Sequence, residues 1–181
     1  YLSNMIECCS ILIIPMAMVF AFGFYVNRKR LGCSLYGVML VAFLIGVCIN
    51  VSQEMGGNPR IDAMGIAQDD GAMEGKEVRL GAGATGLWSV VTTVTSNGSV
   101  NGMHDSTMPL SGMIEMLNMQ INTWFGGVGV GWMNYFTFII IAVFISGLMV
   151  GRTPEFMCHK VEAKEMKIAS IVALLHPFVI L

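Results

Sequence analysis

The sequence has few charged residues and only five cysteines. Only 12% of its 181 residues are Asp, Glu, Lys or Arg, against about 25% in a typical soluble domain. The formal net charge is −2, so no basic surface of the kind that binds nucleic acid is expected. The five cysteines have neither metal-ligand spacing nor the pattern of a disulfide framework. With 55% hydrophobic residues, these deficits exclude a soluble domain and indicate a membrane protein.

Four apolar segments contain most of the hydrophobic residues. Residues 5–26 and 35–51 approach the roughly 20 residues that a helix needs to cross a bilayer. Residues 132–150 form a third segment of this length, with Trp and Tyr at one end. A fourth begins near Ile168 and contains the last residue. We therefore expect an all-α membrane protein and, without an initial methionine or signal peptide, a piece of a longer chain.

Basic residues concentrate in the two loops that follow the first and third segments. They are Arg28, Lys29, Arg30, Arg152, Lys160, Lys164 and Lys167. The positive-inside rule predicts that both loops are cytoplasmic, which places the region 52–79 outside. Six acids in that region fit either a solvated vestibule for cations or an ordinary soluble loop. They are Glu54, Asp62, Asp69, Asp70, Glu74 and Glu77.

The region 80–105 combines a short semi-apolar segment with a polar loop. Residues 80–94 would make a helix only about 22 Å long, too short to span a bilayer comfortably. The loop after it is rich in Thr, Ser, Asn and Gly, and such backbone is stable at membrane depth only inside protein or beside a watery cavity. This order is typical of a re-entrant pore loop whose backbone carbonyls replace the hydration shell of an ion. We expect Gly98 to give the chain the freedom to aim those carbonyls at one axis.

Five motifs, in order along the chain, resemble one family of proteins. They are MEGKEVRLG (73–81), VTTVTSNGSVNGMHDS (91–106), FGGVGVG (125–131), GLMVGRTPEF (147–156) and EMKIA (165–169). The chain resembles the potassium-translocating A subunit of the Kdp-type potassium-transporting ATPase. This family belongs to a superfamily of potassium transporters built from four repeats of helix, re-entrant pore loop and helix.

The resemblance implies a function, a cofactor and partners. The A subunit selects potassium in a high-affinity uptake pump of the bacterial inner membrane, embedded in lipid. A P-type ATPase B subunit hydrolyses ATP, and small C and F subunits complete the complex. The only implied cofactor is the potassium ion, with no organic cofactor. The matching filter residues, which would coordinate potassium chiefly through the backbone oxygens of the first four, are Thr95, Ser96, Asn97, Gly98 and Ser99.

The resemblance also divides the chain into segments. Residues 1–26 would be the second helix of the preceding repeat, followed by a cytoplasmic loop at 27–34. The next repeat would comprise its first helix at 35–51, an extracytoplasmic loop at 52–79, the pore helix at 80–94, the filter and its exit at 95–105 and a broken second helix at 106–150. A cytoplasmic loop at 151–167 would lead to the start of another repeat at 168–181. The break in the second helix would be the loop 126–131 with Gly126, Gly127, Gly129 and Gly131, which could act as a gate or serve only as a glycine-rich packing kink.

Two departures from the family pattern keep an alternative open. Asn97 stands where many relatives have cysteine, and the sequence Asn122, Thr123, Trp124 occurs where relatives commonly carry a glutamate. A backbone ligand survives the first change, whereas an ion-coupling role of the missing acid is in doubt. The alternative is a structural or assembly segment with a degenerate filter.

Three other patterns are interpreted more simply. The glycines of residues 126–131 have the spacing of a dinucleotide-binding motif, but no βαβ unit surrounds them. His104 and Asp105 suggest hydrogen-bonding support of the filter rather than acid–base catalysis. The chain has no P-loop and no phosphorylatable aspartate motif, so it is not expected to be the ATP-hydrolysing subunit.

Overall fold

A computed structural model describes residues 1–127, 130–151, 153–157 and 159–181. The elements in chain order are α1 (Leu2–Tyr25), α2 (Lys29–Met55), α3 (Pro59–Asp62), α4 (Gly81–Val94), the 3-10 turn η1 (His104–Ser106), α5 (Pro109–Ile121), α6 (Val130–Val150), β1 (Glu155–Phe156), β2 (His159–Lys160) and α7 (Ala163–Ile180). Among the described residues, three stretches are long and apolar enough to span a membrane: Leu2–Tyr25, Lys29–Ala63 and Val130–Val150. The chain is therefore an all-α, multi-pass membrane protein, which confirms the predicted fold class.

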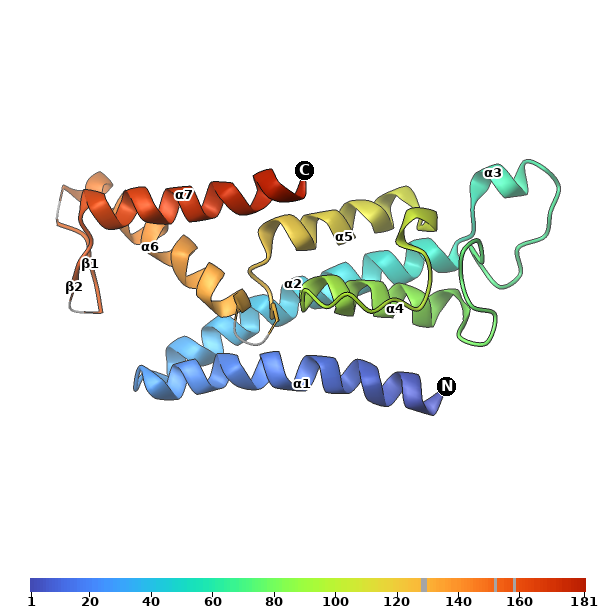
Figure 1. The fold of residues 1–181 in the computed structure, drawn as a ribbon, viewed down its shortest axis with the longest axis horizontal. Helices are drawn as coiled ribbons and strands as arrows, with labels where there is room; N and C mark the ends of the chain where they lie inside the picture. Colours follow the sequence, from blue (N-terminus) through green and yellow to red (C-terminus); the bar gives the residue numbers. More distant parts are fainter. Residues whose placement is uncertain (128–129, 152, 158) are drawn as a thin grey trace.

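Helices α1 and α2 form an antiparallel hairpin (Figure 1). Two glycines, Gly23 and Gly32, face each other so closely that a Cβ added to either would lie 2.9 Å from the other's Cα. The turn between the helices occupies only residues 26–28, with Asn27 in the left-handed region at φ 58°. Helix α2 thus begins at Lys29 rather than at residue 35. Lys and Arg are good helix formers, so a helix continues beyond the apolar run that marks its lipid-buried part.

Helix α4 lies against α2, α5 and α1 and is enclosed by them over most of its length (Figure 1). Ten of its 14 residues are buried, including the polar Thr85, Ser89, Thr92 and Thr93. The hydroxyl of Thr93 donates to the carbonyl of Ser89, and that of Thr85 donates to Gly81. Because its polar groups are satisfied internally, this short helix can lie at membrane depth without contacting lipid along most of its surface.

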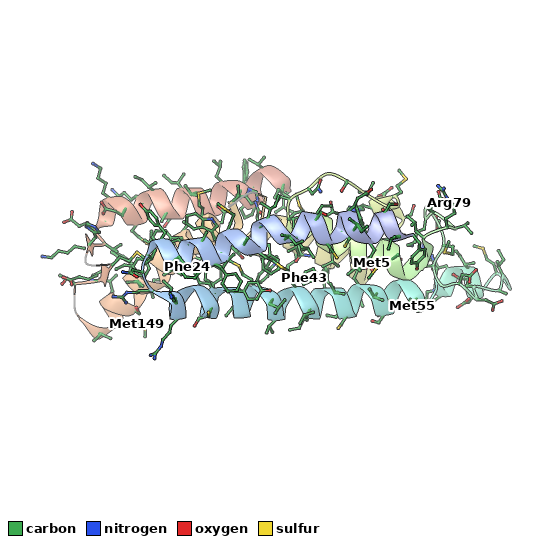
Figure 2. The ribbon with its side chains drawn as sticks, turned by 90° about the horizontal axis from the view of Figure 1, so that it is seen from below. Met5, Phe24, Phe43, Met55, Arg79 and Met149 are labelled. Carbon is green, nitrogen blue, oxygen red and sulfur yellow. The ribbon has the colours of Figure 1, made fainter. Side chains whose placement is uncertain are left out.

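The long helices turn large apolar side chains outward. Met5 and Phe24 of α1 and Met149 of α6 are 64%, 62% and 84% exposed, and all three are labelled in Figure 2. Within α6, Gly131 is the one buried residue among those described. Apolar surfaces of this extent are stable against lipid tails or against further apolar helices.

The second half of the chain departs from the expected boundaries. The predicted broken helix consists of α5, which ends at Ile121, and α6, which resumes at Val130. The break therefore begins earlier than residue 126, and Gly131 lies in the first turn of α6. Gly129 lies outside the described residues, as does Arg152. A small β1–β2 hairpin interrupts the expected loop 151–167.

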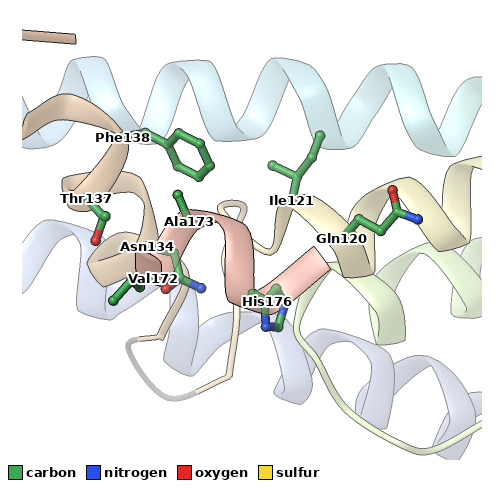
Figure 3. A pocket seen from close by; sticks show the side chains of 8 residues that line it. All are labelled: Gln120, Ile121, Asn134, Thr137, Phe138, Val172, Ala173 and His176. Atoms are coloured by element: carbon green, nitrogen blue, oxygen red, sulfur yellow. The ribbon is translucent and has the colours of Figure 1, made fainter. Parts of the chain in front are cut away.

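Helix α7 begins at Ala163 rather than near Ile168. A capping box fixes its start, in which the side chain of Glu165 accepts from the backbone N–H of Glu162 at 3.0 Å. In α7, the ring nitrogen Nε2 of His176 lies 3.0 Å from the carbonyl oxygen of Met119 in α5. Beside this contact, residues of α5, α6 and α7 line a partly open pocket of about 10 Å³ (Figure 3), which is the room needed by about one water molecule.

Candidate functional site

The polar loop formed by residues 95–99, called here the filter loop, follows directly from the C-terminus of α4. Thr95 is buried, whereas Ser96, Asn97 and Gly98 are exposed. The last carbonyls of a helix have no partner within the helix and carry a partial negative charge. The end of α5 lies beside the same loop, because Ser96 Oγ donates to Asn122 Oδ1 at 2.7 Å. Two helix C-termini therefore meet where a cation would be attracted.

The backbone of the filter loop is held in an unusual conformation. Ser96 lies in the left-handed region with φ 52°, and so does its partner Asn122 with φ 42°. Non-glycine residues are uncommon there and persist when surrounding contacts hold them. One such contact is the bond between the backbone N–H of Asn97 and the carbonyl of Thr92, at 2.9 Å. Contacts within the protein thus hold the loop in this conformation.

Side chains of α4 bind some of the loop's carbonyls and leave others available. Thr92 Oγ1 donates to the carbonyl of Asn97 at 2.8 Å, and Trp88 Nε1 donates to that of Ser99 at 3.1 Å. Within the part of the chain that the structure describes, the carbonyls of Thr95, Ser96 and Gly98 accept no hydrogen bond. A carbonyl oxygen has two lone pairs, so Asn97 can still share its second one. These oxygens are the ligand type that replaces the hydration shell of potassium.

Gly98 does not have the left-handed backbone found elsewhere in the filter loop. The left-handed backbone of the loop falls on Ser96, while Gly98 is outside the set of positive-φ glycines. An added Cβ at Gly98 would meet no atom within 4 Å among the described residues. The absence of a side chain therefore keeps the exposed side of the loop open, rather than relieving strain in the backbone.

The segment between α5 and α6, described over residues 122–127 and called here the break, packs against the end of α4. The backbone N–H of Gly126, at φ 61°, donates to the carbonyl of Val94 at 2.8 Å. Phe125 is fully buried, with its ring centroid 6.0 Å from that of Phe43 in α2. A Cβ added to Gly127 would lie 3.7 Å from the carbonyl oxygen of Thr95. The break therefore adjoins the first residue of the filter loop.

Asn118 of α5 connects the break to α4, and Asn134 connects it to α6. Asn118 donates to Thr93 Oγ1 at 3.3 Å and accepts from Trp124 Nε1 at 3.0 Å. Asn134 of α6 donates to the carbonyl of Asn122 at 3.0 Å. The sequence analysis did not single out Asn118 or Asn134. The signal for Asn118 is an amide within the mostly apolar helix α5, because a buried amide needs hydrogen-bond partners.

The two residues expected to support the filter, His104 and Asp105, lie in different surroundings. His104 Nδ1 lies 3.6 Å from Glu115 Oε2 of α5, and this carboxyl is only 6% exposed. The side chain of Asp105 is exposed and makes no hydrogen bond or ion pair with other described residues. The chain after the filter loop is held by a contact that the sequence did not predict. The side-chain amides of Asn4 and Asn101 bind each other reciprocally.

A buried ion pair lies at the C-terminal end of α2. Glu54 Oε2 is 2.7 Å from Lys76 Nζ, with side-chain exposures of 0% and 1%. Glu54 Oε1 also accepts from the N–H of Met108, the N-cap of α5, at 2.9 Å. Lys76 pairs with Gly102 in an isolated β-bridge. Glu54, one of the six acids of the region 52–79, is therefore enclosed by tertiary contacts rather than solvated, and so is Lys76.

Comparison with known proteins identifies the family. A family model described as "Potassium-transporting ATPase A subunit" matches residues 1–181. The chain belongs to this family. The predicted resemblance is thereby confirmed over the whole sequence.

Individual relatives in bacteria carry the name potassium-transporting ATPase potassium-binding subunit. The relative from Phocaeicola vulgatus is 86% identical over 100% of this chain, and the one from Flavobacterium johnsoniae is 57% identical over 100%. The one from Rhodospirillum centenum is 47% identical over 99% of the chain. The chain spans 32% of the length of each of these curated relatives. It therefore corresponds to about one third of a member of this family.

Proposed function

We propose that this chain supplies one of the four pore loops that select potassium in an ATP-driven uptake pump of the bacterial inner membrane. The observation that carries the proposal is the set of filter-loop carbonyls that accept no hydrogen bond from the described residues, at the meeting point of the α4 and α5 C-termini. Residues 81–94 are then the pore helix, and α5 and α6 are the two halves of a broken second helix. Loops 26–28 and 151–162 are cytoplasmic, in agreement with their basic residues.

Potassium is the transported ion in this proposal. Its ligands from this chain are the backbone oxygens of Thr95, Ser96, Asn97 and Gly98. They supply one side of a ring that three further repeats complete, so the described part alone binds the ion incompletely. The partial negative ends of α4 and α5 favour a cation at this place without a full negative charge, which would bind the ion too tightly to release it.

ATP hydrolysis belongs to another subunit in this proposal. The printed name of the relatives designates a potassium-binding subunit of an ATPase. A P-type ATPase B subunit would supply the energy, with C and F subunits in the same complex. The alternative of a structural segment with a degenerate filter is less well supported, since such a segment has no need of a shaped loop with carbonyls left available.

The hydroxyl of Thr92 provides a test of the filter assignment. Thr92→Val keeps the shape of this buried side chain but removes the donor to the Asn97 carbonyl. Because one neutral hydrogen bond contributes about 0.5–1.5 kcal/mol, we expect the apparent KM for potassium to rise by roughly 2- to 12-fold. The measurement is potassium-stimulated ATP hydrolysis by the purified full-length complex.

The matched control is Thr137→Val in α6, which removes a hydroxyl whose one hydrogen bond among the described residues is to its own helix, at Met133. Its apparent KM should stay within about twofold of the wild-type value. Equal effects of the two substitutions would contradict a role of the residue 95–99 loop in ion selection.

The break is proposed to gate the path below the filter loop. Gly127→Ala adds a methyl group at ordinary contact distance, 3.7 Å from the Thr95 carbonyl, so the fold should accept it. Alanine restricts the backbone by roughly 0.5–1 kcal/mol relative to glycine, and a segment that must rearrange should then move more slowly. We expect a lower maximal transport rate, by about two- to fivefold, with an unchanged KM for potassium. An unchanged rate in a flux assay with reconstituted complex would favour the packing-kink alternative.

A further inference from the structure

An open apolar groove lies between α1, α2 and α4, with a volume of about 560 Å³. Its floor contains the buried side chains of Phe43, Trp88 and Val91. Met5 and Cys9 also line the groove and are exposed. Figure 2 labels Met5 on α1 and Phe43 on α2, the two long helices that flank it. An unfilled apolar surface forfeits dispersion contacts, so the groove is suited to an apolar ligand.

The length of the groove indicates which ligand. Apart from Tyr1, its lining runs from Asn4 to Leu12 in α1, from Phe43 to Val51 in α2 and from Gly83 to Val91 in α4. Each stretch advances eight residues, which is about 12 Å along a helix. A spanning helix needs the full thickness of the hydrocarbon core, about 30 Å, and one leaflet provides about half of it. The groove therefore has the length of an acyl chain in one leaflet, which is the outer one in the orientation proposed above.

A polar pocket of about 250 Å³ adjoins the outer end of the groove and shares Tyr1 and Asn4 with it. Glu7 of α1 and Arg79, two residues before α4, bring opposite charges to this pocket. Arg79 Nε donates to Glu77 Oε1 at 2.8 Å, which uses one of the five N–H groups of the guanidinium. The others are suited to a phosphate, which arginine binds in a bidentate way. The carboxylate of Glu7 is suited to an ammonium group. The pocket thus matches both charges of a zwitterionic headgroup.

We infer that the groove binds an acyl chain of a zwitterionic phospholipid with a primary ammonium headgroup, such as phosphatidylethanolamine. Its phosphate pairs with Arg79 and its ammonium with Glu7. The acyl chain packs against Trp88, whose Nε1 donates to the last carbonyl of the filter loop. The headgroup adjoins Asn4, which binds Asn101. The lipid therefore lies against two contacts that hold the filter loop and the chain after it. The inference goes beyond the proposed function, because lipid binding here does not depend on which ion the filter loop selects.

The test uses the purified full-length complex in vesicles that contain phosphatidylethanolamine with a diazirine in one acyl chain. After illumination, mass spectrometry should find lipid adducts in the residue 5–12 segment of α1. Arg79→Gln and Glu7→Gln, both at exposed positions, should each lower this labelling by roughly two- to fivefold, the scale of a solvent-exposed charge pair. The same diazirine probe built on phosphatidylglycerol, which has no ammonium for Glu7, should label the segment more weakly as well.

A bulky substitution tests the groove itself. Ala84→Phe places a ring among the residues that line it and should reduce the labelling by about tenfold, because each methylene group displaced from apolar surroundings weakens binding. Val41→Phe is the matched control, since Val41 is 58% exposed on α2 and does not line the groove. Its labelling should stay within about twofold of wild type. Size-exclusion chromatography checks the assembly of each variant, and the two surface variants decide if Ala84→Phe does not assemble.

Two results would overturn the inference. Absence of adducts from residues 5–12 would mean that another apolar segment of the complex covers the groove. Adducts that Arg79→Gln, Glu7→Gln and the change of headgroup all leave unaltered would show only boundary lipid without a specific site. Neither result bears on potassium selection, which Thr92→Val tests separately.

Discussion

Replacing Gly98 by Asp is expected to abolish the preference of the complex for potassium over rubidium and ammonium. The space around an ideal Cβ at Gly98 is open, and the backbone there is not left-handed, so the loop can fold with the new side chain. A carboxylate 4 Å from a cation contributes about 4 kcal/mol near a protein surface. Selection among ions of similar size depends on smaller differences between carbonyl ligands. We expect the attraction of the carboxylate to outweigh these differences and so to remove the preference.

The measurement is ATP hydrolysis by the full-length complex, stimulated by each of the three ions over a range of concentrations. Potassium and rubidium should converge to apparent KM values within about threefold of each other. Gly98→Ala is the matched control, because it adds the Cβ without the charge and should change the ion preference far less. If the Asp variant kept the wild-type profile, the assignment of residues 95–99 to the filter would have to be withdrawn.

The parts of the fold that could be predicted from sequence depend on local composition. The apolar runs in α1, α2 and α6 locate three spanning stretches, and the run of small polar residues after α4 locates the loop. Helix ends were less predictable. Helix α2 begins at Lys29 and α7 at Ala163, both in polar sequence. Hydrophobicity does not mark a helix end there, and capping or helix propensity determines the boundary.

The contacts that shape the candidate site were predictable only where they are local. A bond such as that from Thr92 to Asn97 joins residues five apart, close to the reach of a helix end. The amide pair of Asn4 and Asn101 joins residues 97 apart, which no single sequence can indicate. Glu54 shows the same limit. In sequence it is one of six acids in a polar region, and only the fold reveals that Lys76 and the N-terminus of α5 enclose it.

Removing the Glu54 carboxylate is expected to cause the largest loss of stability in this part of the protein. Glu54→Ala leaves the ammonium of Lys76, which is 1% exposed, without its partner. Breaking a buried ion pair from one side costs about 3–5 kcal/mol. The same substitution frees the N–H of Met108 at the start of α5. We expect a marked fall in the thermal unfolding temperature of the purified complex and in its amount in the membrane.

Two further variants decide whether the cause is the unpaired charge. The double substitution Glu54→Met with Lys76→Met should recover most of the lost stability, because an apolar pair of similar volume removes both desolvation costs. Glu77→Ala should change stability by about 0–1 kcal/mol, since its ion pair with Arg79 is solvated, with side-chain exposures of 45% and 86%. A double variant as unstable as Glu54→Ala would assign the loss to the Met108 hydrogen bond. The carboxylate would then stabilise the start of α5, and Lys76 would contribute little to the region that holds Gly102 and the chain leaving the filter loop.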